Sequence, residues 1–186
     1  MGVVADALKL TYEHYLELPE DGKRHELVDG EHLTTPSPSR RHQAISANLL
    51  GALWTFLKRH GGGEVLSAPF DVVLSEVDVV QPDLVFVSRD RQSILTDRNV
   101  EGAPDLVVEI VSEATRRRDE LVKRRLYARF GVREYWVVDP ELETVRVLRL
   151  GEQGYQEVGI LSRDASDSLT TDLLPGLAIP LADVFP

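Results

Sequence analysis

The sequence predicts an α/β domain in which helices flank a mixed central sheet, and three observations indicate this. The chain has 186 residues, of which 42% are hydrophobic and 28% charged, enough apolar material for one sizeable core. In its middle part, strand-like runs are followed by an amphipathic helix and another strand, an order typical of sheets covered by helices. Residues 105–111 are nearly all apolar and β-branched, as a strand buried on both faces should be. We therefore expect one domain over residues 1–186.

The N-terminal region predicts a short helix followed by a β-hairpin. Residues 11–18 fit a helix with Thr11 as its N-cap and Pro19 after it. The Asp-Gly pair at 29–30 separates two strand-like runs, and such a pair is a strong hairpin signal. Prolines within residues 34–39 then predict a loop.

A long amphipathic helix is predicted over residues 39–60. Ser39 can cap its start, and the glycines at 61–63 would end it. Its apolar residues recur at helical spacing: Ala44, Ala47, Leu50, Leu53, Trp54 and Leu57.

The remainder of the chain predicts a series of strands interrupted by one helix. The expected strands cover residues 64–75, 79–80, 83–87, 105–111, 134–138 and 144–150. An amphipathic helix over residues 116–130, ended by Gly131, would lie between the strands at 105–111 and 134–138. The last thirty residues predict a strand hairpin and then a tail apolar enough to pack against the core.

Composition excludes several classes of function. The chain has no cysteine, so disulfides, thiolate nucleophiles and zinc-thiolate sites are excluded. No apolar run approaches the ~20 residues of a membrane helix, and Asp6 and Lys9 interrupt the start of the chain. We therefore expect a cytoplasmic protein without a membrane partner. The net charge of -10 disfavours extensive phosphate binding, although basic residues cluster at 40–41, 58–59 and 116–125.

Glu109 is the most informative residue, because an ionisable carboxylate in the most apolar strand is unfavourable unless it is paired or binds a metal. Asp105 lies on the same strand, ~13 Å away at ~3.3 Å per residue, which is too far to share one ion. Asp83 comes from another strand and could lie beside Glu109. We therefore expect Asp83 and Glu109 to hold Mg²⁺ or Mn²⁺, the ions that hard oxygen ligands suit. The alternative is a structural ion pair of Glu109 with Lys123 or an arginine.

Other polar residues are candidates for the same site. Lys123 lies about two turns into the helix that follows the Glu109 strand, so its side chain could reach back and orient a nucleophile. The alternative is that Lys123 belongs to a solvated helix face. Glu26, on the hairpin, is a possible further catalytic acid. The residues expected to contact a nucleic acid are His42, Arg40, Arg41 and Arg116.

Six segments of the chain carry a resemblance to a known family. They read RHELVDGEHL, PSPSRRHQ, VVQPDLVFVSRD, GAPDLVVEIVSEAT, DELVKRRLYARFGVREYWVVDP and LLPGLAIPLADVF. In this order, over residues 10–185, the sequence resembles the Uma-type family of putative restriction endonucleases, common in bacteria and assigned to the PD-(D/E)xK nuclease superfamily. The resemblance implies a restriction-endonuclease-like αβββαβ core, here with extra β-hairpins, a Mg²⁺-dependent phosphodiesterase site and a homodimer.

The resemblance also implies roles for individual residues. It places the motif aspartate at Asp83, the acidic third element at Glu109 and an earlier family glutamate at Glu26. Two positions after Glu109, where the superfamily usually has lysine, this chain has Val111. Lys123 on the following helix is expected to replace that lysine.

Three hypotheses for function follow. The first is a Mg²⁺-dependent nuclease that hydrolyses phosphodiester bonds of DNA. The second is a catalytically silent nuclease-fold protein with an interaction or regulatory role, which the acidic net charge and Val111 favour. The third is a metal-dependent phosphodiesterase that acts on a small molecule.

Overall fold

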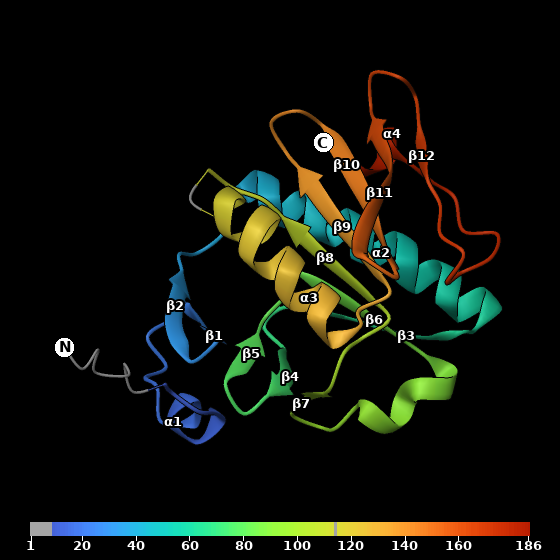
Figure 1. Cartoon of the computed structure of the whole chain (residues 1–186). Coiled ribbons are helices and arrows are strands. Elements are labelled where there is room, and N and C mark those ends of the chain that lie inside the picture. The colour runs from blue at the N-terminus through green and yellow to red at the C-terminus, as the bar shows by residue number, and fades with distance from the viewer. Residues whose placement is uncertain (1–8, 114) are drawn as a thin grey trace.

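The computed structural model describes residues 9–113 and 115–186, and its centre is a six-stranded sheet (Figure 1). In spatial order the strands are β11 (Gly154–Ser162), β10 (Thr144–Gly151), β9 (Glu134–Asp139), β8 (Leu106–Ile110), β6 (Leu84–Ser88) and β3 (Gly63–Ser67). The helical elements are α1 (Tyr12–Leu16), α2 (Arg40–His60), the 3₁₀ turn η1 (Arg89–Ile94), the π-helical turn η2 (Arg118–Lys123), α3 (Arg124–Phe130) and α4 (Leu181–Val184). Strands β8 and β9 run parallel, and η2 with α3 forms the crossover that such a pair requires.

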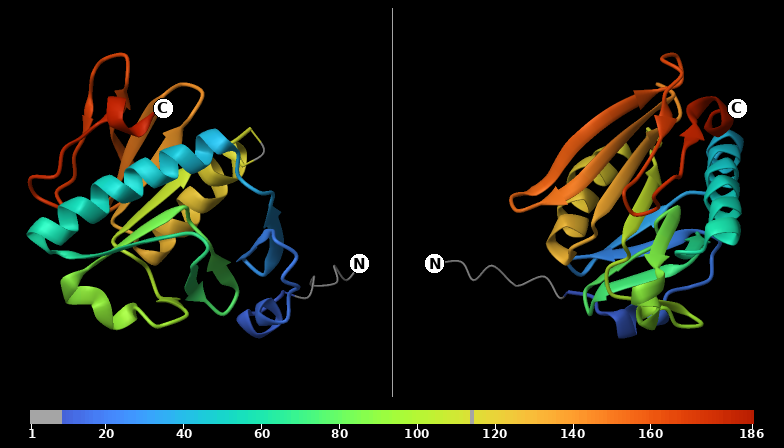
Figure 2. Two further views of the ribbon diagram at one scale, coloured as in Figure 1. Left: turned by 180° about the vertical axis from the view of Figure 1, so that it is seen from behind. Right: turned by 90° about the vertical axis from the view of Figure 1, so that its right-hand side faces the viewer.

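Helices cover both faces of this sheet, with α2 on one face and α3 on the other (Figures 1 and 2). Successive side chains of β8 therefore enter two different cores. Val108 and Ile110 belong to the core on the α2 side, whereas Val107 and Val111 belong to the core on the α3 side. Because side chains alternate along a strand, Glu109 points toward α3 and the preceding η2.

A second, five-stranded sheet carries the N-terminal hairpin. Its spatial order is β2 (Glu31–Thr35), β1 (Arg24–Val28), β5 (Asp78–Val80), β4 (Asp71–Ser75) and β7 (Asn99–Glu101). Strand β5 belongs to this sheet and β6 to the six-stranded one, so residues 81–83 cross from one sheet to the other. This crossing places Asp83 at the junction of the two sheets.

Local sequence signals correctly predicted the hairpin and the long helix. Asp29 and Gly30 both adopt positive φ, 52° and 77°, in the turn between β1 and β2. At the start of α2, the Ser39 hydroxyl accepts a hydrogen bond from the His42 backbone N–H. Gly61 ends the helix with a φ of 73°.

The C-terminal tail packs against the core, as the sequence predicts. It contains the short paired strands β12 (Ser168–Leu169) and β13 (Ile179–Pro180) and ends in α4. Its buried apolar residues join the core on the α2 side: Leu174, Leu177, Ile179, Leu181, Val184 and Phe185. None of the helices in the described part of the chain combines the length and apolar character needed to cross a lipid bilayer.

The structure corrects two expected elements and adds others, among them the short helix α4 in the tail. The single strand expected over residues 64–75 is wrong, because β3 and β4 lie in different sheets. Between them lies Pro69, which has no N–H to donate to a ladder. The helix expected over residues 116–130 is present, but its first part is the π-helical turn η2. Neither η1 nor β7 was predicted.

Candidate active site

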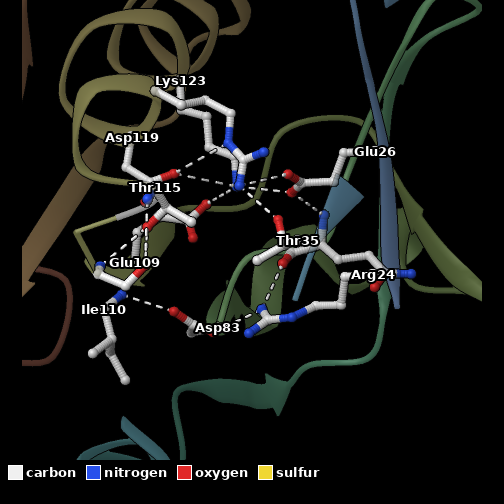
Figure 3. Close-up of polar contacts among 12 residues, drawn as sticks. Arg24, Glu26, Thr35, Asp83, Glu109, Ile110, Thr115, Asp119 and Lys123 are labelled. Atoms are coloured by element: carbon white, nitrogen blue, oxygen red, sulfur yellow. Dashed lines mark hydrogen bonds and ion pairs between the residues drawn. The ribbon is translucent and has the colours of Figure 1, made fainter. Parts of the chain in front are cut away.

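Asp83 and Glu109 lie opposite each other on two neighbouring strands. The antiparallel register of β6 and β8 pairs Leu84 with Val108. Asp83, which precedes Leu84, is therefore opposite Glu109, which follows Val108. Asp83 Oδ2 accepts a hydrogen bond of 2.7 Å from the backbone N–H of Ile110 (Figure 3). The carboxylate chosen from the sequence thus lies next to the strand that carries Glu109.

Two cationic or polar side chains hold the same carboxylate. Arg24, the first residue of β1, donates to Asp83 Oδ1 at 2.7 Å and to the carbonyl of Gln81 at 3.3 Å. His42 Nε2 lies 3.2 Å from Asp83 Oδ2. Burial opposes ionisation of Asp83, but His42, Arg24 and the Ile110 N–H outweigh it and hold the Asp83 pKa below its ordinary value. Asp83 is therefore an ionised carboxylate at neutral pH.

Glu109 and Lys123 form the centre of a second, more deeply buried group. Lys123 Nζ donates to Glu109 Oε1 at 2.8 Å and to Glu26 Oε1 at 2.7 Å. Tyr127 donates its hydroxyl to the same Glu109 oxygen at 2.6 Å. The Lys123 side chain is only 3% exposed, so it reaches back from the helix as the sequence predicts and does not lie on a solvated face.

The π-helical turn η2 brings a further acid to this group. Asp119 and Lys123 are both buried, and their Oδ1 and Nζ atoms lie 3.7 Å apart. The Tyr135 hydroxyl donates to the Asp119 carbonyl at 3.0 Å. π-Helical turns occur frequently at functional sites, where they change which side chains share a helix face.

Three buried carboxylates, those of Glu26, Glu109 and Asp119, share two cations: the Lys123 ammonium, and Arg118, which lies 3.9 Å from Glu26 Oε2 and from Asp119 Oδ1. Burial raises the pKa of Glu109 to about 8, since the effects of Asp119, Asp83 and Glu26 offset that of Lys123. Burial disfavours the charged form of Lys123, but the surrounding acids raise its pKa above the usual range. Two buried oxygens, Glu26 Oε2 and Asp119 Oδ1, have no hydrogen-bond partner among the described residues. Such oxygens are unfavourable unless a cation or water satisfies them.

These donors fit a hard divalent cation. Asp83, Glu109 and Glu26 supply only oxygen ligands, as Mg²⁺ and Mn²⁺ prefer. Within residues 9–113 and 115–186, no three acidic or histidine side chains converge into a complete metal site. Mg²⁺ commonly uses one or two carboxylates and keeps several waters, so two carboxylates beside an open cleft suffice for it.

The site opens into a cleft of about 800 Å³. Residues of β1, of the segment 81–83 and of the end of β8 line it, together with the loop of residues 35–39 before α2. The charged and histidine side chains that line it are Arg24, Glu26, Arg41, His42, Asp83, Glu109, Glu113, Arg118, Asp119, Lys123 and Glu141.

The expected nucleic-acid-binding residues are placed differently with respect to the cleft. His42 and Arg41 line it, although Arg41 is also paired with Glu143 at 2.6 Å. Arg40 is exposed at the start of α2, and neither Arg40 nor Arg116 lines the cleft. Arg116 is paired with Asp139.

Three side chains of the site were missed from the sequence: Arg24, Asp119 and Tyr127. Asp119 and Tyr127 lie four residues before and after Lys123, so helical spacing could have indicated them. Arg24 lies two residues before Glu26 in β1, so strand alternation could have indicated it. Arg118 donates to the Thr35 hydroxyl at 2.6 Å, a contact between distant segments that no local pattern predicts.

Asp105, the aspartate excluded as a partner of Glu109, has a structural role. Its carboxylate accepts a hydrogen bond of 2.8 Å from the Ser88 N–H and pairs with Arg91 at 3.1 Å and Arg133 at 3.3 Å. Burial opposes ionisation of Asp105, but Ser88 and Arg91 outweigh it and lower its pKa. The stabilisation that results is present above the ordinary pKa, ~3.9, and is lost as the pH falls through the lower folded value.

We expect Asp105→Asn to destabilise the protein at pH 7 by about 1–3 kcal/mol, because charged hydrogen bonds are lost. The difference from wild type should shrink as the pH falls below about 4, where the wild-type carboxylate also becomes protonated. Urea unfolding of both proteins between pH 3 and pH 7 measures this. A difference that stays constant over that range would contradict the assignment.

Comparisons with known proteins place the chain in a family and show a fold that it shares with a solved structure. A family model described as "Putative restriction endonuclease" (Uma2) matches residues 12–182. A solved structure described as a putative nuclease belonging to DUF820 from Anabaena variabilis ATCC 29413 superposes with a TM-score of 0.78. It is 19% identical, and the match covers 95% of this chain and 97% of that one, which shows a shared fold. No curated protein matches the chain.

Proposed function

This chain belongs to the Uma2 family of putative restriction endonucleases, and from that premise we propose that it is a Mg²⁺-dependent nuclease that hydrolyses DNA. One observation carries the proposal: Asp83, Glu109 and Lys123 come from three different elements and converge on one open cleft. A structural ion pair of Glu109 with Lys123 would also explain a buried acid. Such a pair requires neither the nearby carboxylate of Asp83 nor an open cleft.

In this proposal, different residues of the chain have different roles in phosphodiester hydrolysis. Asp83 and Glu109 would hold the ion, with the Ile110 carbonyl as a further ligand. A bound Mg²⁺ supplies Lewis-acid polarisation of the phosphate and lowers the pKa of a water. Lys123 stabilises charge that develops on the phosphate and orients the attacking water. Glu26 keeps the Lys123 ammonium in place, since it accepts a hydrogen bond of 2.7 Å from it.

The flanking basic residues would position the nucleic acid. Arg41 and Arg118 line the cleft, and Arg40 and Arg116 lie on the segments beside it. Arginine suits this role, because its planar fork matches two phosphate oxygens. We propose DNA as the substrate and a homodimer as the assembly, in keeping with the family resemblance.

A catalytically silent protein of the same fold is the second candidate. The net charge of -10 and the pairing of Arg41 with Glu143 favour it, because both weaken attraction for phosphates. The two candidates differ in whether the cleft acts on a phosphodiester bond at all.

The test compares wild type with Glu109→Gln on plasmid DNA in Mg²⁺, in Mn²⁺ and in EDTA. We expect metal-dependent cleavage by wild type and a loss of about two orders of magnitude in Glu109→Gln, because a metal ligand is worth several kcal/mol. Single-stranded DNA and RNA, assayed in parallel, define the substrate.

Equal cleavage by the two proteins would indicate a contaminating nuclease and remove the support for the proposal. Mn²⁺ binding by wild type without cleavage of any nucleic acid would favour the silent protein. Cleavage of a small phosphodiester alone would favour the small-molecule phosphodiesterase.

A further inference from the structure

Arg24 occupies a position that the proposed reaction does not explain. Its side chain extends from β1 to Asp83, as Figure 3 shows, and its guanidinium lies 2.7 Å from Asp83 Oδ1. The other oxygen, Oδ2, already accepts the Ile110 N–H and lies 3.2 Å from His42. Both oxygens of the expected metal ligand are therefore engaged by the protein itself.

This arrangement and a bound divalent cation oppose each other. A Mg²⁺ ion lies ~2.1 Å from a ligand oxygen, so an ion on Oδ1 would lie within about 5 Å of the guanidinium carried by the same oxygen. Two positive centres at that distance in a largely buried site repel each other strongly. An ion that binds Asp83 through Oδ1 therefore has to displace Arg24.

Arg24 is less buried than Lys123. The Arg24 side chain is 18% exposed, begins at the first residue of its strand and lines the cleft. Lys123 is 3% exposed and bonded to both Glu26 and Glu109. Release of Asp83 would leave the Arg24 guanidinium at the cleft, where a planar fork suits a phosphate group.

We propose that Arg24 is the resident counter-ion of Asp83, which a divalent cation displaces into the cleft, where it then binds a phosphate of the substrate. The inference rests on the proposed function, because it assumes that Asp83 is a metal ligand. Arg24 is a positioning residue in the metal-free protein and a substrate contact in the loaded one.

The first experiment measures Mn²⁺ affinity of the intact protein by isothermal titration calorimetry. If Arg24 holds Asp83 for nine-tenths of the time, Arg24→Gln should bind Mn²⁺ about tenfold more tightly than wild type. Arg24→Lys, whose single ammonium competes less well, should lie between them. Arg129→Gln is the matched control: it removes the same charge from an ion pair of 2.8 Å with Asp78, and Arg129 does not line the cleft.

The second experiment measures binding of a short DNA duplex in Ca²⁺, a divalent cation that also takes carboxylate oxygens as ligands. We expect Arg24→Gln to bind this duplex several-fold more weakly than wild type and Arg129→Gln to match wild type. The proposal thus expects Arg24→Gln to bind Mn²⁺ more tightly and DNA more weakly. If the ion pair were only structural, its loss would misplace Asp83 and weaken the binding of both Mn²⁺ and DNA.

Mn²⁺ affinity in Arg24→Gln and Arg24→Lys that is equal to or weaker than wild type overturns the inference and leaves the proposed function intact. If wild type itself binds no Mn²⁺, the metal site of the proposed function is wrong and the inference falls with it. Circular dichroism of each variant confirms that the comparison is made between folded proteins.

Discussion

Replacing Asp83 with asparagine should abolish cleavage, with a loss of roughly a thousandfold or more. Asparagine keeps the shape of the side chain and one carbonyl oxygen, but it removes the negative charge that a divalent cation requires. It also leaves Arg24 without the carboxylate that it contacts at 2.7 Å. The measurements are the cleavage rate in Mg²⁺ or Mn²⁺, which should fall, and the Mn²⁺ dissociation constant, which should rise with it.

Asp105→Asn is the control that the chain itself offers. Asp105 also follows a proline, is fully buried and lies beside strand β8, but its partners are Ser88, Arg91 and Arg133. We expect this variant to retain its cleavage rate within a few-fold, provided it is assayed well below its unfolding temperature. Equal losses in both variants would show that the effect of Asp83→Asn is one of stability.

Replacing Lys123 with methionine should give the largest loss of stability, about 3–5 kcal/mol at pH 8. Methionine fills a similar volume, yet it leaves Glu26, Glu109 and Asp119 buried without their ammonium partner. Cleavage should be lost as well, because the Lys123 ammonium then no longer stabilises the charge that develops on the phosphate. Urea unfolding in EDTA measures the first effect and the plasmid assay the second.

The pH dependence distinguishes this cause from a packing defect. The buried acids can take up protons at lower pH, so the loss in Lys123→Met should shrink between pH 8 and pH 5. The double variant Lys123→Met with Glu109→Gln should recover part of the stability, because one buried charge is removed. Lys58→Met, on the exposed side of α2, should change stability by less than about 0.5 kcal/mol. A loss in Lys123→Met that is the same at both pH values would contradict the electrostatic explanation.

The sequence alone determined the features that depend on residues close together in the chain. The hairpin at Asp29-Gly30, the capped helix α2 and the apolar strand β8 each follow from turn chemistry, caps and periodicity. The unusual position of Glu109 could be recognised for the same reason, because its neighbours in the sequence alone show an acid among β-branched residues. Strand geometry also favoured Asp83 over Asp105 as the neighbour of Glu109, because it fixes how far apart two residues of one strand must lie, and the structure places Asp83 opposite Glu109.

The tertiary structure decided which distant groups meet. It divided the run at 64–75 between two sheets and placed Asp83 at their junction. It also brought Arg24 of β1 to Asp83, and Glu26 of the same strand to Lys123. Charges pair through space, and the separation of two elements in space depends on the order of strands and not on their distance along the chain. Local patterns therefore identified the acids, while only the packed sheets and helix showed which cations serve them and where a cleft remains open.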